Sequence, residues 1–234
     1  MPSIKELKET LAYSCNILAH EGHWDNILGH VSVRIPGQDR VLMKPHSFGF
    51  EEIRPQHIIV VDLSGKKVEG KYERHSEVFI HTEIYKARSD VHCVVHSHPP
   101  YATAFSALRQ PLRPISHEGN IFHDGLPLFD YTTALIRSPE LGIEVAKSLG
   151  KCRGVLMKNH GSTVVGESIE VATLYAVFLE KAARIQLMAT ASGEPSWTSD
   201  EEAKIKYEQI YTPHRLGSMW DYFVRRAKKL RKSA

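Results

Sequence analysis

A short, mostly apolar run that ends in two histidines constrains the fold of this chain more than any other feature. Residues 91–95 read Val-His-Cys-Val-Val, which predicts a buried strand, and Pro99-Pro100 ends it. Side chains at positions i and i+2 of a strand point to the same face, so His96 and His98 present two imidazoles side by side. Neutral imidazole is a good ligand for zinc and similar divalent metals. The spacing predicts a metal site, although two surface histidines near a turn would give the same pattern.

Two other segments place polar groups where they can join such a site. Residues 74–85 combine a capping residue with apolar residues at helical spacing, so they predict the start of a helix. Glu77 lies in its first turn, where the helix dipole stabilises a carboxylate, and His81 follows one turn later on a face that Glu77 can share. Later, an apolar strand that begins at Gly154 leads to a polar tip with His160. Capping alone would explain Glu77, and a loop position alone would explain His160.

Length and composition limit the class of protein. A chain of 234 residues with 42% apolar residues can bury a substantial core, and short loops without a linker or an internal repeat favour one domain over residues 1–234. We expect no membrane partner, because no stretch approaches the ~20 apolar residues of a membrane span. Residues 1–6 lack the form of a signal peptide, and three widely spaced cysteines (Cys15, Cys93 and Cys152) suggest reduced thiols, so the sequence predicts a cytoplasmic protein.

The net charge of +3 comes from one end of the chain. Residues 225–232 contain six basic and no acidic side chains; without these six, the 30 Lys and Arg residues become 24 against 27 Asp and Glu, a net charge of −3. We interpret the segment from about residue 225 as a basic, solvated tail. It has none of the interleaved aromatic residues that single-stranded nucleic-acid sites use, so nucleic acid is not an expected partner.

Periodicity and turn residues predict a mixture of helices and strands along the chain. Helices are expected at residues 4–22, from Glu77, at 100–108, at 138–150 and at 169–191, with a last helical region after a capping box at Ser199. Strands are expected at residues 31–35, 40–44 and 57–63, with a turn at Ser64-Gly65 that leads into a hairpin arm.

Together these segments resemble the class II aldolase/adducin family. That family's pattern has Ser-Glu followed by His-x-x-Ile-Tyr, then a strand ending in His-x-His-Pro, and later Lys-Asn-His-Gly. The same residues occur here in the same order, and residues 29–34 and 61–70 resemble an early strand and a hairpin of the family. The resemblance covers roughly residues 5–220. The three matching segments are residues 76–85, 96–99 and 158–161.

The resemblance implies a fold and a metal centre. The fold is of the α/β class, a three-layer α/β/α sandwich around a largely antiparallel sheet, which composition alone does not predict. His96, His98 and His160 correspond to the family's metal ligands, and Glu77 corresponds to its catalytic acid/base, which in some members also coordinates the metal. Three imidazoles leave a coordination position open for a substrate oxygen, and the metal then acts as a Lewis acid that stabilises an enolate. One divalent ion per chain is expected; zinc is favoured, and manganese, iron and cobalt stay open.

The expected substrate pocket differs from that of the family's sugar-phosphate enzymes. Those enzymes hold phosphate with Gly-Asn-x-Ser, with a Thr-Pro-x-Gly-like loop and with Ser-Ser before the glutamate. Here His30 stands in place of the asparagine, residues 44–49 read Lys-Pro-His-Ser-Phe-Gly, and His75 replaces the first serine. A phosphate would lose donors and space, whereas a planar carboxylate would gain cationic partners; ordinary surface cations are the alternative for Lys44 and Arg74. The candidate substrate-binding residues are His30, Lys44, His46, Ser47, Arg74, His75 and Ser76.

These differences resemble the branch of the family that decarboxylates hydroxylated aromatic or pyridine carboxylates. The resemblance therefore implies a metal-dependent carbon–carbon lyase that acts on a small anionic molecule. An aldolase or epimerase acting on a hydroxy-carbonyl or sugar-phosphate substrate is the first alternative. A non-enzymatic, adducin-like interaction module is the second, and the presence of all three histidines and of Glu77 argues against it.

The resemblance also implies a homo-oligomer, with a tetramer favoured and the active site between subunits. We expect C-terminal residues such as His214, Trp220 or Tyr222 to approach a neighbour's site, because the aromatic cluster at residues 219–223 is typical of interfaces. The alternative is that these rings pack beneath their own helix. The histidine-rich segment 117–123 either lines the substrate pocket or forms a surface loop.

Overall fold

An eight-stranded sheet runs through the centre of the molecule. The computed structural model describes residues 2–24 and 26–233, and its sheet has the strand order β4-β3-β2-β1-β5-β8-β7-β6. Neighbouring strands are antiparallel, except that β6 runs parallel to β7. The strands are β1 (His30–Arg34), β2 (Arg40–Met43), β3 (Ile59–Asp62), β4 (Lys67–Glu69), β5 (Cys93–Ser97), β6 (Leu128–Phe129), β7 (Gly154–Met157) and β8 (Gly161–Gly166).

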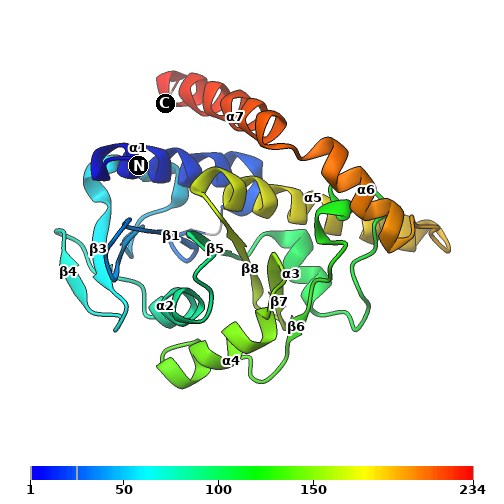
Figure 1. Cartoon of the computed structure of the whole chain (residues 1–234), viewed down its shortest axis with the longest axis horizontal. Helices are drawn as coiled ribbons and strands as arrows, with labels where there is room; N and C mark the ends of the chain where they lie inside the picture. The colour runs from blue at the N-terminus through cyan, green and yellow to red at the C-terminus, as the bar shows by residue number, and fades with distance from the viewer. Residues whose placement is uncertain (1, 25, 234) are drawn as a thin grey trace.

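Helices cover both faces of this sheet (Figure 1). Helices α1, α5 and α7 lie over one face, and α2 and α4 lie over the other. The α/β/α sandwich around a largely antiparallel sheet is therefore confirmed. The α-helices are α1 (Ile4–Leu18), α2 (Val78–Ala87), α3 (Pro100–Ser106), α4 (Pro139–Leu149), α5 (Ile169–Ser192), α6 (Asp200–Ile210) and α7 (Pro213–Ser233). The shorter turns of other helix types are η1 (Ala19–His23), η2 (Phe50–Glu52), η3 (Pro55–His57) and η4 (Gly119–Phe122).

Alternation along the strands divides the buried apolar residues into two cores, one on each side of the sheet. Val60 of β3 packs into the core beneath α1 and α5, whereas its neighbour Val61 packs into the core above α2 and α4. The two cores hold the sheet rigid between the helical layers. Polar side chains that the sheet presents at one end of β5 are therefore held by packing on both faces.

Strand β5 lies between β1 and β8, and its limits differ from those predicted. We predicted a strand at residues 91–95, but β5 extends two residues further along the chain, to Ser97. His96 is paired with His30 of β1 on one side and with Thr163 of β8 on the other. Because backbone pairing continues on both sides, His96 is buried within the sheet and His98 follows the strand directly.

Most other predicted elements are present with ends shifted by a few residues, and α4 begins after Ser138 and ends at Gly150 as predicted. Two strands were missed, β6 and β8. The predicted last helical region is divided into α6 and α7. The division falls just before Pro213, because a proline interrupts helical hydrogen bonding but fits the first turn of a new helix.

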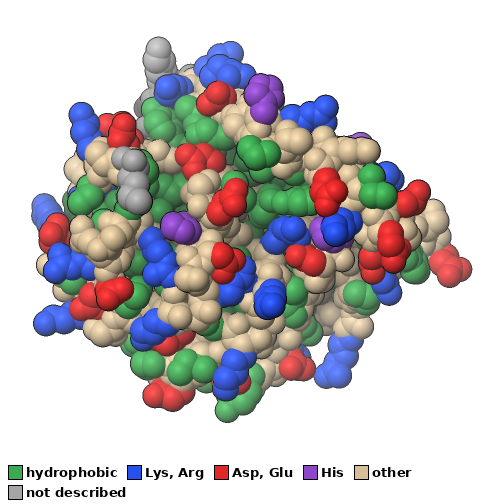
Figure 2. Space-filling model, in the orientation of Figure 1, with side chains coloured by type: hydrophobic (Ala, Val, Ile, Leu, Met, Phe, Trp, Pro, Cys, Tyr) green, Lys and Arg blue, Asp and Glu red, His purple; other side chains and the backbone are tan. Residues whose placement is uncertain are grey.

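The C-terminal helix α7 packs on its own chain. Trp220 and Phe223 contact the core beneath α1 and α5, which matches the alternative in which these rings pack beneath their own helix, whereas Tyr222 is half exposed. Acidic and basic side chains are interspersed over the visible face of the described residues (Figure 2). Within residues 2–24 and 26–233, no helix is both long and apolar enough to cross a membrane.

Candidate active site

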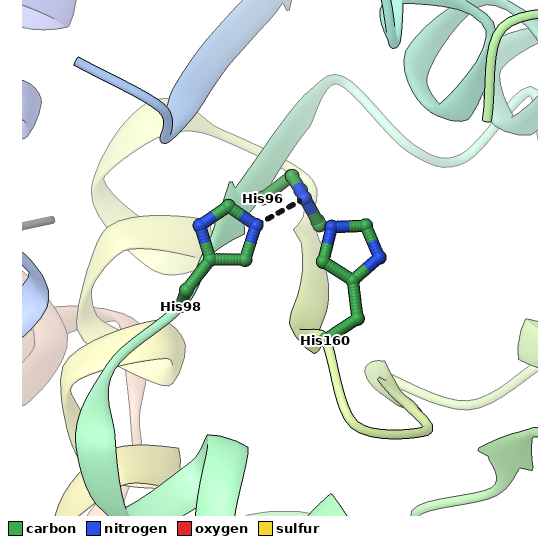
Figure 3. A group of neighbouring side chains, drawn as sticks. All are labelled: His96, His98 and His160. Atoms are coloured by element: carbon green, nitrogen blue, oxygen red, sulfur yellow. Dashed lines mark hydrogen bonds between the residues drawn. The ribbon is translucent and has the colours of Figure 1, made fainter. Parts of the chain in front are cut away.

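Three histidine rings converge beside the end of β5 (Figure 3). His96 belongs to β5, His98 follows that strand, and His160 lies in the turn between β7 and β8. The ring centroid of His96 lies 4.7 Å from that of His98 and 5.0 Å from that of His160, and the His98 and His160 centroids lie 4.9 Å apart. The structure thus brings together the three side chains that the sequence predicts as metal ligands.

Two residues of the β7–β8 turn explain how His160 reaches this position. Asn159 has a φ of +55°, a left-handed conformation that asparagine adopts more readily than most residues. A Cβ atom on Gly161 would lie 2.5 Å from the carbonyl oxygen of Ser97 and 2.8 Å from Cδ2 of His98. Glycine is required there because β8 approaches β5 this closely beside the histidines.

A hydroxyl group behind His96 determines which ring nitrogen faces the site. Oγ1 of Thr163 lies 3.1 Å from Nδ1 of His96 and donates its own proton to the sulfur of Met157 at 3.4 Å. The Thr163 oxygen therefore accepts from Nδ1–H, which leaves the Nε2 lone pair of His96 facing the other histidines. Burial holds the pKa of His96 well below its ordinary value, so the ring is neutral. A neutral ring with a free Nε2 is the form that binds metal ions.

Glu77 faces the histidines from the start of α2. Its side chain makes no capping bond to the helix; instead Oε1 accepts a hydrogen bond from the Ile136 backbone N–H at 2.8 Å. Oε2 lies 3.7 Å from Nε2 of His160 and 4.0 Å from Nε2 of His96. Burial raises the pKa of the Glu77 carboxyl, and the Ile136 N–H offsets part of that rise. Capping therefore does not explain this side chain, which is oriented into the site and holds a proton more readily than an exposed glutamate does.

The donor set fits one divalent metal ion. Two nitrogens bound to a single tetrahedral zinc ion lie about 3.3 Å apart, and the Nε2 atoms of His96 and His98 lie 3.0 Å apart. One ligand atom from each of His96, His98 and His160 lies within 4.8 Å of the others. Three imidazoles fill three positions of a tetrahedral site, and Glu77 lies close enough to fill the fourth or to stand beside it.

Comparison with known proteins assigns the chain to a family. The family described as "Class II Aldolase and Adducin N-terminal domain" matches residues 9–187. The chain belongs to this family. It is 34% identical to "Decarboxylase NovR" of Streptomyces niveus over 82% of its own length and 72% of that protein. It is 33% identical to the "3,4-dihydroxyphthalate decarboxylase" of Arthrobacter keyseri over 80% of its length and 79% of that protein.

A solved structure of a class II aldolase shares the fold. The "L-fuculose 1-phosphate aldolase from Glaciozyma antarctica PI12" superposes with a TM-score of 0.87 and covers 100% of this chain and 94% of its own, at 24% identity. The sequence-based assignment to the class II aldolase/adducin family, with a resemblance to its decarboxylases, is confirmed.

His30 joins the class II aldolase-like site from β1. One ring nitrogen of His30, one of His96 and a carboxylate oxygen of Glu77 all lie within 4.8 Å of one another. His30 is fully buried, and burial is the main cause that lowers its pKa well below the ordinary value, followed by the neighbouring His75 and His81 rings. His30 is therefore a neutral imidazole beside the Glu77 carboxyl.

Lys44 and His75 are buried and bonded to protein groups. Lys44 is 1% exposed and donates to the carbonyl oxygens of Ile27 and Pro45, each at 3.3 Å. Its Nζ also lies 3.3 Å from Nε2 of His75, whose pKa burial and the Lys44 charge lower to about 2. Lys44 is thus not an ordinary surface cation, because it ties residues 27 and 45 to the His75 ring.

The remaining candidate substrate residues lie nearer the surface. His46 is half-buried, and its Nδ1 lies 2.6 Å from Oγ of Ser47. Ser47 is exposed and has a φ of +69°, an uncommon conformation for a residue other than glycine. Arg74 donates to the carbonyl oxygen of His75 at 2.8 Å, and Ser76 is exposed. The structure groups His46 with His75, with ring centroids 5.2 Å apart.

The histidine-rich segment 117–123 packs elsewhere. Its central turn, η4, is buried and contacts α5 and α6. The His123 ring lies 5.5 Å from the Tyr207 ring of α6, and His117 is exposed. The surface-loop interpretation therefore describes His117 but not the rest of the segment.

His81, together with two polar residues that the sequence analysis did not select, Ser32 and Tyr85, extends the site into the interior. Helical spacing suggested a pairing of His81 with Glu77, but the His81 ring faces β1, where its Nε2 lies 2.6 Å from Nδ1 of His30. Two sequence signals could have found this group. His30 and Ser32 share one face of β1, and His81 and Tyr85 are one turn apart on α2.

Proposed function

We propose that this chain is a metal-dependent carbon–carbon lyase that decarboxylates a hydroxylated aromatic or pyridine carboxylate. The observation that carries the proposal is the convergence of three imidazoles on a carboxyl group whose pKa is raised by burial. Similarity to two proteins named as decarboxylases favours decarboxylation within the family. A class II aldolase acting on a hydroxy-carbonyl compound would use the same groups and is the second candidate.

In this proposal His96, His98 and His160 hold one divalent ion, with zinc favoured. When bound, such an ion supplies a Lewis acid that stabilises negative charge on a substrate oxygen. Thr163 orients the His96 ring from behind, and Gly161 lets the strand carrying that hydroxyl approach β5. These contacts set the position of the rings before any ligand arrives, which lowers the cost of assembling the site.

Glu77 is the proposed proton donor. When carbon dioxide leaves, the ring carbon that carried it must gain a proton. The raised pKa means that the Glu77 carboxyl holds a proton more readily than an exposed glutamate, which suits a general acid. The Ile136 N–H fixes Oε1, so Oε2 is the oxygen that faces the histidines and transfers the proton.

The rings around His30 favour a flat anionic substrate. The His30 and His75 centroids lie 4.5 Å apart, at positions where the sugar-phosphate pattern has small polar residues. A phosphate group needs several oriented hydrogen-bond donors, whereas a planar carboxylate needs one flat imidazole face and one cationic partner. Arg74, half-buried beside His75, is the proposed cationic partner, and the buried Lys44 is proposed to add positive charge from behind His75. The proposed assembly is a cytoplasmic homo-oligomer, with a tetramer favoured.

The metal assignment is tested by measuring the metal content of the purified protein and its variants. Purified protein should contain about one divalent ion per chain, and His96→Ala and His160→Ala should each lose it together with activity. His117→Ala removes an exposed imidazole outside the cluster and serves as the control. Full metal content in both site variants would refute the ligand assignment, and a wild type without stoichiometric metal would favour an adducin-like interaction module.

The reaction class is tested with two substrate panels. Metal-loaded enzyme is incubated with ortho-hydroxy aromatic and pyridine carboxylates and, separately, with hydroxy-carbonyl compounds and sugar phosphates. We expect carbon dioxide from the first panel. Aldehyde from the second panel, with no carbon dioxide from the first, would replace the decarboxylase proposal with the aldolase.

A further inference from the structure

His98 differs from the other two clustered histidines because a helix follows it almost directly. Its strand, β5, ends at Ser97, which still pairs with Ser162 of β8. Helix α3 begins at Pro100. His98 therefore lies in the short link between the sheet and α3, and its position depends on what holds each end of that link.

The link between the strand and the helix has little conformational freedom. The residues between Ser97 and Tyr101 are His98 and two prolines. A proline ring fixes its own φ near about −65°, and a residue that precedes proline is biased toward extended conformations. Pro99 accordingly has a φ of −68° and a ψ of 145°. A displacement of the first turn of α3 is therefore passed on to His98, because the prolines cannot absorb it.

A buried carboxyl group of α5 holds the first turn of α3. Oε1 of Glu180 accepts a hydrogen bond from the Tyr101 backbone N–H at 2.9 Å, and Oε2 accepts one from the Ala102 N–H at 2.7 Å. Proline has no N–H, so these are the first two donors that α3 offers. The next N–H, that of Thr103, already donates to the carbonyl oxygen of Pro99. Glu180 thus does for α3 what a capping side chain does for other helices, since the proline before this helix makes no capping bond.

Glu180 is itself held firmly by its surroundings. It is 6% exposed, and both of its oxygens are bonded. Its helix, α5, packs on α3 and on β8, the strand next to β5. Arg184 lies about one turn later on α5, with its guanidinium carbon 5.3 Å from the centre of the Tyr101 ring. Two side chains of α5 therefore tie the start of α3 to the layer that also supports β5.

We propose that Glu180 is a positioning residue that sets where His98 lies in the three-histidine cluster. His96 is placed by backbone pairing on both sides of β5, and Thr163 orients its ring. His98 is held by the sheet at one end of the link and by Glu180, through α3, at the other. In this position Nε2 of His98 lies 3.0 Å from Nε2 of His96, and the His98 ring stacks on that of His160 with 10° between the planes (Figure 3).

Only the consequence for metal binding rests on the proposed function. If His98 is a metal ligand, loss of the Glu180 contacts should weaken metal binding by about 10–100-fold, the range found when a group that orients a ligand is removed. Glu180 acts through α3, so its removal should change the affinity and the geometry of the metal site. Its effect on the position of the His98 ring needs neither metal nor substrate.

The first arm of the test therefore uses metal-free protein. Glu180→Gln keeps the shape of the side chain but has one acceptor oxygen instead of two, so one N–H of α3 loses its partner. We expect the ring C–H resonances of His98 to shift in NMR spectra of ¹³C-labelled protein. Unshifted His98 resonances in a folded Glu180→Gln protein would overturn the proposal. If this variant does not fold, Glu180→Asp, which keeps both oxygens on a shorter side chain, is measured in the same way.

Gln186→Met is the matched control for both arms. Gln186 is also buried on α5 and also bonds backbone groups, but those of residues 111 and 113, which follow α3. Its replacement breaks contacts between α5 and the same stretch of chain without touching the first turn of α3. Because the residue lies on the same helix, the control separates a specific effect on His98 from a general loosening of α5.

The second arm measures the binding and the visible spectrum of Co²⁺, whose absorption reports its coordination geometry. Glu180→Gln should bind Co²⁺ about 10–100-fold more weakly than wild type and lose part of the absorption of four-coordinate Co²⁺, whereas Gln186→Met should match wild type. Equal losses in the two variants would reveal a general effect of α5 and refute the positioning role. Wild-type affinity and spectrum in Glu180→Gln would refute it as well, even if carbon dioxide is released normally.

The outcomes separate this inference from the proposed function. A wild type that takes up no Co²⁺ would contradict the ligand assignment, and the His98 resonances of the metal-free variants would then decide alone whether Glu180 positions that ring. A wild type that binds Co²⁺ but releases no carbon dioxide from any hydroxy acid would contradict the decarboxylase proposal and leave both arms of this test in force.

Discussion

Acidification below about pH 6.5 should progressively destabilise the metal-free protein. Burial, with the Lys44 charge, lowers the pKa of His75 to about 2, and burial lowers that of His81 to about 3. Both rings have the ordinary value of about 6.5 when the chain is unfolded. A folded-state pKa below the unfolded one means that the stability is fully present above pH ~6.5 and is lost as the pH falls below it.

The magnitude follows from one proton per ring. Between about pH 5.5 and 3.5 the unfolded chain holds one more proton than the folded chain on each histidine. The free energy of unfolding then falls by about 1.4 kcal/mol per pH unit for each ring, or roughly 2.7 for His75 and His81 together. From pH 6.5 to 3.5 the two rings remove roughly 7 kcal/mol, comparable to the total stability of many domains. His30 and His96 are shifted in the same direction and steepen the slope.

Carboxyl groups act in the opposite direction where burial raises their pKa. The folded chain takes up protons on Glu77 and Glu180 before the unfolded chain does, which offsets part of the loss. The histidine effect is therefore clearest between about pH 6.5 and 5, where the unfolded chain takes up protons on its histidines.

The assay is urea unfolding with a chelator present, at pH values from 7 to 4. His81→Gln removes one buried imidazole, so its free energy of unfolding should depend on pH by about 1.4 kcal/mol per unit less than wild type. His117→Gln removes an imidazole that solvent reaches in both states and should keep the wild-type slope. A wild type whose stability does not change between pH 6.5 and 5, or equal slopes for the two variants, would refute the reasoning.

Three further predictions concern the site and the assembly. Glu77→Gln should preserve the fold and bound metal but lower turnover by ~10²–10⁴-fold, and near-normal turnover at saturating metal would place the proton donor elsewhere. Thr163→Val should lower metal affinity by about 10–100-fold, because Nδ1 of His96 loses its acceptor, whereas Thr198→Val, remote from the rings, should not. Light scattering should give the mass of a multimer at working concentration; a monomer would exclude a site shared between subunits.

Local rules predicted the part of the site that lies within one element. His96 and His98 come together because alternate residues of an extended chain share a face. His160 reaches the site because β8 pairs with β5, and no local sequence pattern predicts that pairing. The family resemblance supplied that neighbour relation. β8 itself was missed because it reads Gly-Ser-Thr-Val-Val-Gly, with glycine at both ends and few apolar residues to mark a strand.

The burial of polar residues was harder to predict from the sequence. His81 and Glu83 occur on a helix whose sequence shows no clean polar face, and both are buried. Sequence periodicity treats a histidine as polar and places it at the surface. Whether it can be buried depends on partners from another element, as Ser32 of β1 shows for His81.

The same burial disfavours charge on two groups of the site, His96 and Glu77. Desolvation opposes charge of either sign, so it lowers the pKa of His96 and raises that of Glu77. The His96 imidazole is therefore neutral and able to bind a cation, and the proposed decarboxylation would take its proton from a carboxyl that holds one more readily than an exposed glutamate does. Among the described residues, Glu77 is the only carboxyl in the two candidate ligand groups, so a dication held there would keep a net positive charge and favour a substrate that brings negative charge of its own. A carboxylate with an adjacent ionisable hydroxyl brings two such charges on a flat ring, so the electrostatics and the imidazole-lined shape both agree with the substrate class that we propose.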